Sequence, residues 1–162
     1  MKEHVVINDD RTITVPTYAQ KIGIQYDHNV NTLVFDCPRY SDDVDLSTMT
    51  VYINYLLSDG TLGAYLADNV RVDEANDRLM HFDWTIKNTV TQVFGLVTFL
   101  VCIKDVDDDG NELYHWNTEM VSKLKVSKGM ENAASIIEKH PDLVTQLTQL
   151  VNKLKDGNEV AY

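Results

Sequence analysis

The segment "TMTVYINYLLSDGTLGAYLA", from Thr48 to Ala67, contains two strand patterns separated by a turn. In its first half apolar side chains alternate along the chain, so every second one points to the same face of a strand. The dipeptide Asp59-Gly60 then interrupts the alternation, and such a pair is typical of a tight β-hairpin turn. The segment therefore predicts two consecutive paired strands. One face of the first strand carries Val51, Ile53, Tyr55 and Leu57.

The same alternation recurs further along the chain. In "RLMHFDWTI", residues 78–86, four apolar side chains are predicted to point inward and three polar ones outward. The segment "GLVTFLVCIK", residues 95–104, is apolar on both faces and is predicted to be a central strand. The inward set is Met80, Phe82, Trp84 and Ile86, and the outward set is His81, Asp83 and Thr85.

These segments and their neighbours give about seven or eight short strands, spaced as in a sandwich or barrel. Strand-like segments do not alternate with long helical ones, which argues against a doubly wound parallel sheet. The sequence therefore predicts a mainly β protein, with an antiparallel β-sandwich over residues 1–128.

The composition changes in residues 129–162, which are rich in helix-forming residues. Pro141 suits the first turn of a helix better than its interior. A short helix to about Lys139 and an amphipathic one from Pro141 to about Lys155 are therefore predicted. Apolar side chains recur with a/d heptad spacing, and we call them the apolar stripe. The apolar stripe consists of Ile136, Leu143, Leu147, Leu150 and Leu154.

A helix of this length is only marginally stable by itself in water. Its apolar stripe needs a partner, which is either the sandwich domain of the same chain or the same helix in other copies. Oligomerisation through the apolar stripe is predicted, and packing against the chain's own domain remains the alternative.

Length and charge narrow the possible partners. The chain has 162 residues, enough for one domain and an appendage, and its 25 acidic and 14 basic residues give a formal net charge of −11. Nucleic-acid binding draws on Lys and Arg at phosphates, so it is not expected. No apolar run approaches the length of a membrane span, and the first residues lack the apolar core of a signal peptide. Cys37 and Cys102 lie in strand-like runs and are predicted to be small core residues.

The acidic segment "DVDDDG", residues 105–110, resembles the start of an EF-hand calcium loop. An EF-hand closes with a bidentate carboxylate at its twelfth position, where this chain has Trp116. The flanking segments are also strand-like rather than helical. We therefore interpret the segment as an acidic hairpin turn, and no metal is expected. The calcium ligands that would otherwise apply are Asp105, Asp107, Asp109 and Asn111.

The sequence gives only weak evidence for a zinc site, an active site or a sugar-binding site. His81, Asp83 and His115 could converge if their strands pair, but their spacing does not match a zinc signature. No nucleophile, phosphate-loop or dinucleotide motif occurs, so neither an enzyme nor a cofactor is expected. Tyr114 and Trp116 share one strand face and could serve as a platform for a sugar. A carbohydrate-binding β-sandwich, possibly assisted by calcium, is therefore the alternative function.

The order of four segments resembles the N-terminal domain of phage baseplate upper proteins and related tail proteins of Firmicutes phages and prophages. The segments are "VPTYAQKIGIQYDHNVNTLVFDCPRY", "DLSTMTVYINYLLSDGTLGAYLADNV", "HFDWTIKNTVTQVFGLVTFLVCI" and "LYHWNTE". The resemblance covers roughly Val5 to Val126 and includes no catalytic signature.

This resemblance implies a β-sandwich that anchors into a phage tail or baseplate, followed by a helical stalk that is usually trimeric. It implies other tail or baseplate proteins as partners, a homo-oligomer, and a place in the virion after synthesis in the host cytoplasm. The chain ends at Tyr162, soon after one helical stretch, without a long stalk or head domain. A structural or adaptor role is therefore expected rather than direct recognition of the host.

Overall fold

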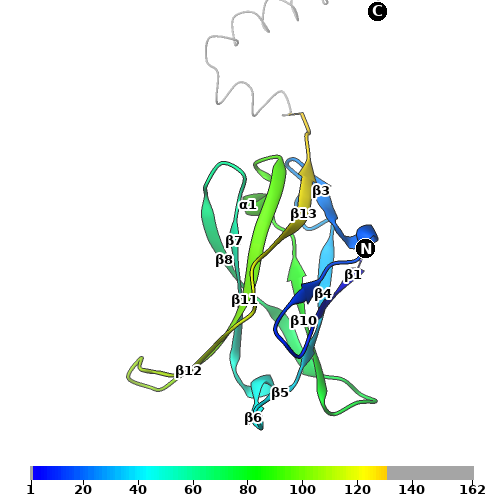
Figure 1. The fold of residues 1–162 in the computed structure, drawn as a ribbon. Helices are drawn as coiled ribbons and strands as arrows, with labels where there is room; N and C mark the ends of the chain where they lie inside the picture. Colours follow the sequence, from blue (N-terminus) through cyan, green and yellow to red (C-terminus); the bar gives the residue numbers. More distant parts are fainter. Residues whose placement is uncertain (1, 131–162) are drawn as a thin grey trace, which may run out of the picture. The chain divides into compact units, whose positions relative to one another are not determined.

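The computed structural model describes residues 2–130, which form a sandwich of two β-sheets (Figure 1). The chain divides into two compact units, Met1–Gly129 and Met130–Tyr162, and the description that follows concerns the first. The predicted helices of residues 131–162, with the apolar stripe, lie outside the described residues.

Each sheet is built from strands that are distant in the sequence. Sheet A has the order β2-β1-β4-β10-β9, and sheet B has the order β3-β13-β11-β7-β8 with β12 also paired to β11. The strands of sheet A are β1 (Lys2–Ile7), β2 (Ile13–Thr14), β4 (Thr32–Pro38), β9 (Asp68–Val72) and β10 (Leu79–Thr85). The strands of sheet B are β3 (Lys21–Ile24), β7 (Thr50–Leu56), β8 (Leu62–Leu66), β11 (Gly95–Val106), β12 (Glu112–Asn117) and β13 (Val121–Ser127).

Short elements connect the sheets. The strands β5 (Tyr40–Ser41) and β6 (Val44–Asp45) form a separate small hairpin. The turns of helix are η1 (Thr17–Ala19), η2 (Leu46–Thr48) and α1 (Asn88–Thr91).

The segments with the clearest alternation form the predicted strands. The β7–β8 hairpin turns at Asp59-Gly60, where Gly60 has a φ of 90°. β10 buries its predicted inward set, and β11 is a central strand of sheet B, as expected from its apolar sequence. The prediction of a mainly β sandwich is therefore confirmed for the described residues.

The prediction of a purely antiparallel sandwich is wrong. Within residues 2–130, β1 pairs with β4 in parallel, and β13 pairs with β3 in parallel. The strands within residues 2–130 are also more numerous than predicted, and three of them, β2, β5 and β6, have only two residues. Alternation shows which side chains are buried, but it does not specify which strand lies alongside or in which direction. Between β1 and β4 the chain crosses to sheet B as β3, which allows the return strand to run parallel.

Aromatic side chains from both sheets fill the space between them. Phe35 and Phe82 of sheet A stack with ring centroids 5.0 Å apart. Trp84 contacts Tyr55 of β7 at 5.9 Å and Phe99 of β11 at 5.6 Å. All five rings are buried, so the core joins the two sheets through direct aromatic contacts.

Candidate functional site

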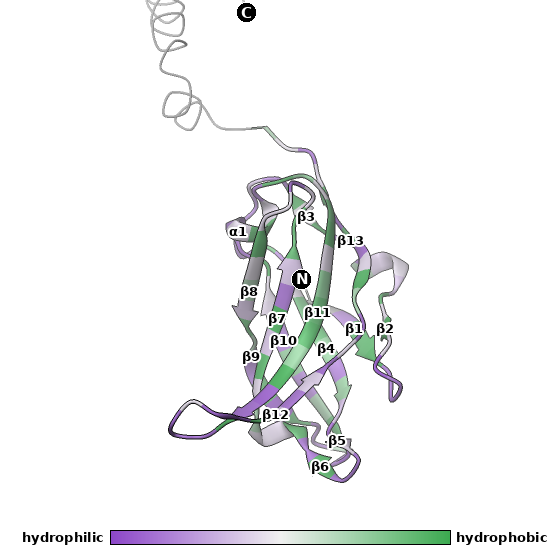
Figure 2. Ribbon diagram, turned by 60° about the vertical axis from the view of Figure 1, so that its left-hand side comes forward, coloured by the Kyte–Doolittle hydropathy of each residue, from purple (hydrophilic) through white to green (hydrophobic). Residues whose placement is uncertain are grey.

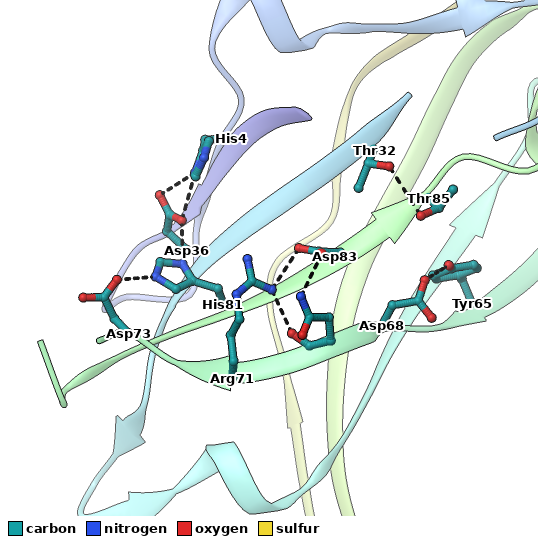
Figure 3. Close-up of polar contacts among 11 residues, drawn as sticks. His4, Thr32, Asp36, Tyr65, Asp68, Arg71, Asp73, His81, Asp83 and Thr85 are labelled. Carbon is teal, nitrogen blue, oxygen red and sulfur yellow. Dashed lines mark hydrogen bonds and ion pairs between the residues drawn. The ribbon is translucent and has the colours of Figure 1, made fainter. Parts of the chain in front are cut away.

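The outer face of sheet A carries a network of histidines and carboxylates, which Figure 3 shows. His81 of β10 lies directly opposite Asp36 of β4, and its Nδ1 is 2.9 Å from the Asp36 carboxylate. His81 Nε2 is 2.7 Å from the carboxylate of Asp73, which follows β9. His4 of β1 approaches Asp36 from the other side, with a distance of 3.1 Å from Nδ1 to Oδ1. The network therefore links β1, β4, β10 and the segment after β9.

The hydrogen bonds within this network occupy the atoms that a metal ion or a substrate would need. Both ring nitrogens of His81 already contact carboxylates, so His81 has no free nitrogen for a metal or a substrate. The hydrogen bond with His81, followed by those from the backbone of Ala75 and Asn76, holds the pKa of Asp73 below its usual value. In the part of the chain that the structure describes, no group of three or more His, Cys, Asp or Glu could hold a metal ion. The network is therefore a set of cross-strand contacts.

A second polar contact on the same face involves a buried carboxylate. Asp83 of β10 is 6% exposed and lies 3.1 Å from Nη1 of Arg71 on β9. Asn69 donates to the other carboxylate oxygen at 3.4 Å and has a positive φ of 52° beside an irregularity in the β9–β10 register. Tyr65 and Asp68 are also hydrogen-bonded on this side of the molecule. Paired charges thus make the outer face of sheet A polar.

The outer face of sheet B carries exposed leucines among a few polar side chains such as Asn54 and Thr98. Its side chains come from β8, β7 and β11, where Leu56 lies opposite Leu62 on one side and Thr98 on the other. Exposure reaches 78% at Leu62 and is 39% at Leu56, while Leu100 is half-buried. Figure 2 shows β11 coloured as hydrophobic over most of its length. We call this surface the apolar face, and its members are Leu56, Leu62, Leu66, Leu96, Leu100 and Met120.

A hollow of about 350 Å³ lies within the apolar face. It is lined by Leu56, Leu62, Leu100 and Met120, with Asn54 and Thr98 as its polar members. The sequence predicts the β11 segment, apolar on both faces, to be a central strand, and this prediction does not identify the surface. In the structure one face of β11 lies in the core, while on the other face Leu96 is exposed, Thr98 and Leu100 are half-buried and Cys102 is buried. A contiguous exposed apolar surface of this kind is characteristic of a protein contact.

The acidic segment forms the predicted turn between β11 and β12. Asp107 accepts hydrogen bonds from the backbone N–H groups of Asp109 and Asn111, at 3.0 and 2.8 Å. These bonds, led by the one from Asn111, lower the pKa of Asp107. Gly110 has a φ of 85°, which a glycine adopts without strain. The hairpin projects from the rest of the described structure, and its tip is hydrophilic (Figures 1 and 2). The Asp107 carboxylate thus stabilises the turn.

The two aromatic residues considered for sugar binding differ in exposure. Trp116 is only 2% exposed, its Nε1 donates to Ser41 at 3.1 Å, and the guanidinium of Arg11 covers its ring at 5.4 Å. Tyr114 is half-buried and packs against the core. The two rings therefore do not form an exposed platform, because a sugar needs an open ring face on which to stack.

One arrangement that the sequence did not suggest joins Cys102, His115 and Glu112. The sulfur of Cys102 is 3.2 Å from His115 Nε2, and His115 Nδ1 is 2.6 Å from Glu112. This order resembles a nucleophile, a base and an orienting carboxylate. Cys102 is 1% exposed, however, and burial raises the pKa of its thiol. A protonated thiol without access to a substrate is a poor nucleophile, so the contact is better explained as packing between β11 and β12.

The remaining predicted residues fall in separate places. Cys37 is buried in the core, and burial raises the pKa of its thiol to about 12. His81 and Asp83 belong to sheet A, whereas His115 belongs to sheet B, so the three do not converge. No helix within residues 2–130 is long and apolar enough to cross a membrane.

The search of solved structures found similar chains, one of which is described below. No family model matches the chain, and no curated protein matches it. The structure is similar to the "N-terminal domain of phage TP901-1 ORF48", a baseplate protein, with a TM-score of 0.43 and 8% identity. The match covers 80% of this chain and 98% of that chain. This neighbour is the same kind of domain as the one named in the resemblance stated from the sequence.

Proposed function

We propose that this chain is a structural protein of a phage tail or baseplate, which binds a neighbouring tail protein through the apolar face of sheet B. The proposal assigns it no catalytic step and no cofactor. The observation that carries it is the exposure of the apolar face, which includes Leu62, Leu66 and Met120 at 59–78% exposure.

The apolar face has the properties of a contact surface. Leu56, Leu62 and Leu100 come from neighbouring strands and line one hollow, so these three form one surface rather than scattered positions. Burying such side chains against a partner removes apolar area from water, at about 25 cal/mol for each Å². The hollow beside Leu100 and Met120 also offers a place for a protruding side chain of the partner.

The phage assignment is supported by the sequence. The four segments quoted for the resemblance cover most of the described residues and most strands of the sandwich, although β1, β2 and β13 lie outside them. A protein that anchors an assembly needs a stable domain and a contact surface, and it needs no active site. The polar face of sheet A, with its internally paired charges, fits that role.

Homo-oligomerisation, with a trimer favoured, is a further part of the proposal. It rests on the apolar stripe, whose residues lie outside the described part of the chain. Light scattering on the full chain tests it, compared with a variant in which Leu147→Gln and Leu150→Gln interrupt the apolar stripe. A monomer in both cases would contradict oligomerisation without affecting the role of sheet B.

The assembly role is tested on phage particles. Particles are produced with the native chain or with the double variant Leu62→Glu/Leu66→Glu, then purified and analysed by quantitative mass spectrometry and negative-stain microscopy. The native chain should be a stoichiometric tail component. The variant should fold normally and be absent from particles, because two charges on the apolar face oppose its burial.

The matched control is Thr61→Glu, an exposed residue in the turn of the same hairpin, outside the apolar face. It adds a charge close to Leu62 and should enter particles normally. Absence of the native chain from tails would overturn the phage role. Normal incorporation of the double variant would instead overturn the contact through sheet B.

A further inference from the structure

A polar groove lies at the end of the sandwich where β5 and β6 are found (Figure 1). It consists of two adjoining hollows of about 410 and 360 Å³. Four residues line both hollows, so the hollows are parts of one depression, which we call the Tyr40 groove. The shared residues are Asp9, Pro38, Tyr40 and Arg78.

Two arginines are held in the Tyr40 groove by aromatic rings. The guanidinium carbon of Arg78 is 5.5 Å from the centre of the Tyr40 ring, and that of Arg11 is 5.4 Å from the centre of the Trp116 ring. A guanidinium that stacks on a ring keeps its N–H groups along its edge, where they can still donate hydrogen bonds. Stacking therefore positions both cations and leaves their donors available.

Neither arginine forms an ion pair with a carboxylate in residues 2–130. Arg11 donates only to the backbone oxygen of Asn117, at 3.5 Å. The neighbouring Arg39 shows the contrast, because it donates to both oxygens of Asp45 at 3.2 and 3.1 Å. Arg39 is thus neutralised within the fold, while the charges of Arg11 and Arg78 remain available to a ligand.

Two carboxylates line the same groove. Asp9 and Asp42 form no ion pair with any cation of the described structure, although both share the lining of one hollow with Arg11 and Arg78. Asp42 has a φ of 47° and Asp43 a φ of 67°, as in the two-residue hairpin turns that favour Asn and Gly. This strained turn between β5 and β6 holds Asp42 at the groove.

We propose that the Tyr40 groove binds a small zwitterionic ligand, whose phosphate or carboxylate contacts Arg11 and Arg78 and whose ammonium contacts Asp9 and Asp42. Charges of both signs line one hollow without neutralising each other. A ligand with the opposite arrangement pairs all of them at once, which a simple anion or a simple cation does not achieve. The groove is separate from the apolar face, so this site does not depend on the proposed assembly role.

Titration of the full-length, ¹⁵N-labelled chain tests the proposal by NMR. The zwitterions are phosphoethanolamine and β-alanine, which distinguish a phosphate from a carboxylate as the anionic group. The comparison compounds, each with charge of one sign only, are ethanolamine, inorganic phosphate and propionate. At least one zwitterion should shift the amide signals of Asn8, Ser41 and Asn76, and it should bind about tenfold more tightly than any of these comparison compounds.

Variants then assign the contacts. Arg78→Gln and Asp9→Asn should each weaken zwitterion binding about tenfold. Lys87→Gln should leave binding unchanged, because Lys87 donates to Asn29 and does not line either hollow. Arg78→Lys keeps the charge but loses the planar donor edge, so its effect should be intermediate. Normal spectra of the unbound variants show that the fold is retained.

Three outcomes would overturn the proposal. The first is a lack of saturable shifts with both zwitterions. The second is equal binding of inorganic phosphate or ethanolamine, which would leave no role for the paired charges. The third is unchanged zwitterion binding by Arg78→Gln.

Discussion

The outer faces of the two sheets differ in the side chains that they present to solvent. Each belongs to strands whose other face is buried in a shared core, so each would be expected to be polar. The outer face of sheet A meets this expectation with paired polar groups, such as the ion pair of Asp83 with Arg71 and the contacts of His81 with Asp36 and Asp73. The outer face of sheet B carries leucines at up to 78% exposure.

We expect the polar side chains of sheet A to contribute to the stability of the fold, and the exposed leucines of sheet B to contribute to association with a partner. On sheet A the polar side chains contact one another, so changing them should alter the free energy of unfolding. On sheet B leucines such as Leu62 and Leu66 are largely exposed to solvent, so changing them should alter association instead. Mutations on the two faces can therefore test the comparison directly.

The largest effect is expected at the pair between Arg71 and Asp83. Arg71→Met leaves a nearly buried carboxylate without its cation and should lower the free energy of unfolding by about 3 kcal/mol. Urea denaturation of the full chain measures it. The double variant Arg71→Met/Asp83→Leu removes both charges and should recover most of the loss. Equal destabilisation by the single and double variants would contradict the electrostatic explanation.

A smaller effect is expected at His81. His81→Phe removes contacts with two carboxylates and should lower the free energy of unfolding by about 2 kcal/mol. His4→Phe is the matched control, because His4 contacts the same Asp36 carboxylate but is exposed. Its effect should stay within about 0.5 kcal/mol, as for other exposed ion pairs. A similar loss of unfolding free energy in the two variants would show that His81, with its two carboxylate contacts, contributes no more to stability than the exposed His4.

The network of sheet A should also make the free energy of unfolding depend on pH in the acidic range. The pKa of Asp73 is lowered in the folded state, chiefly by the hydrogen bond with His81, so the ionised form stabilises the fold. This contribution is present above the unfolded pKa of about 3.9 and is lost as the pH falls through the lower folded value. Asp73→Asn should therefore flatten the fall in unfolding free energy below about pH 4. Asp108→Asn, at the exposed hairpin tip, should leave that slope unchanged.

The smallest effect on stability is expected on the apolar face. Leu62→Thr should change the free energy of unfolding by no more than about 0.5 kcal/mol, because Leu62 is exposed. Leu57→Thr, at a position 2% exposed in the same hairpin, should cost about 2 kcal/mol or more. Thermal unfolding of both variants gives the comparison. A large loss for Leu62→Thr would show that the apolar face is already covered within the chain.

The sequence predicted the parts of the fold that depend on local patterns. The alternation in residues 78–86 predicted that Trp84 points inward and His81 outward, and the structure confirms both orientations. The turns at Asp59-Gly60 and Asp109-Gly110 were also predicted, because a positive φ at glycine is a local property.

The parts that depend on strand order could not be predicted. The network on sheet A requires His4, Asp36 and His81 to lie on neighbouring strands, and alternation does not specify neighbours. The groove depends in the same way on Arg11 and Arg78 meeting at one end of the sandwich. The leucines of the apolar face can be identified in the sequence. The sequence does not show that no other element within residues 2–130 covers them. An apolar run looks the same whether a partner lies in the same chain or elsewhere.

The parallel pairing of β13 with β3 has a consequence for synthesis of the protein. Lys21 at the start of β3 pairs with Lys125, near the end of the domain, and β3 is an edge strand whose neighbour in sheet B is β13. During translation β3 is made early, but its neighbour leaves the ribosome only after all the other strands. Contacts between such distant segments slow folding. Sheet B is therefore completed last, and a nascent chain that stops short of β13 lacks a finished sandwich.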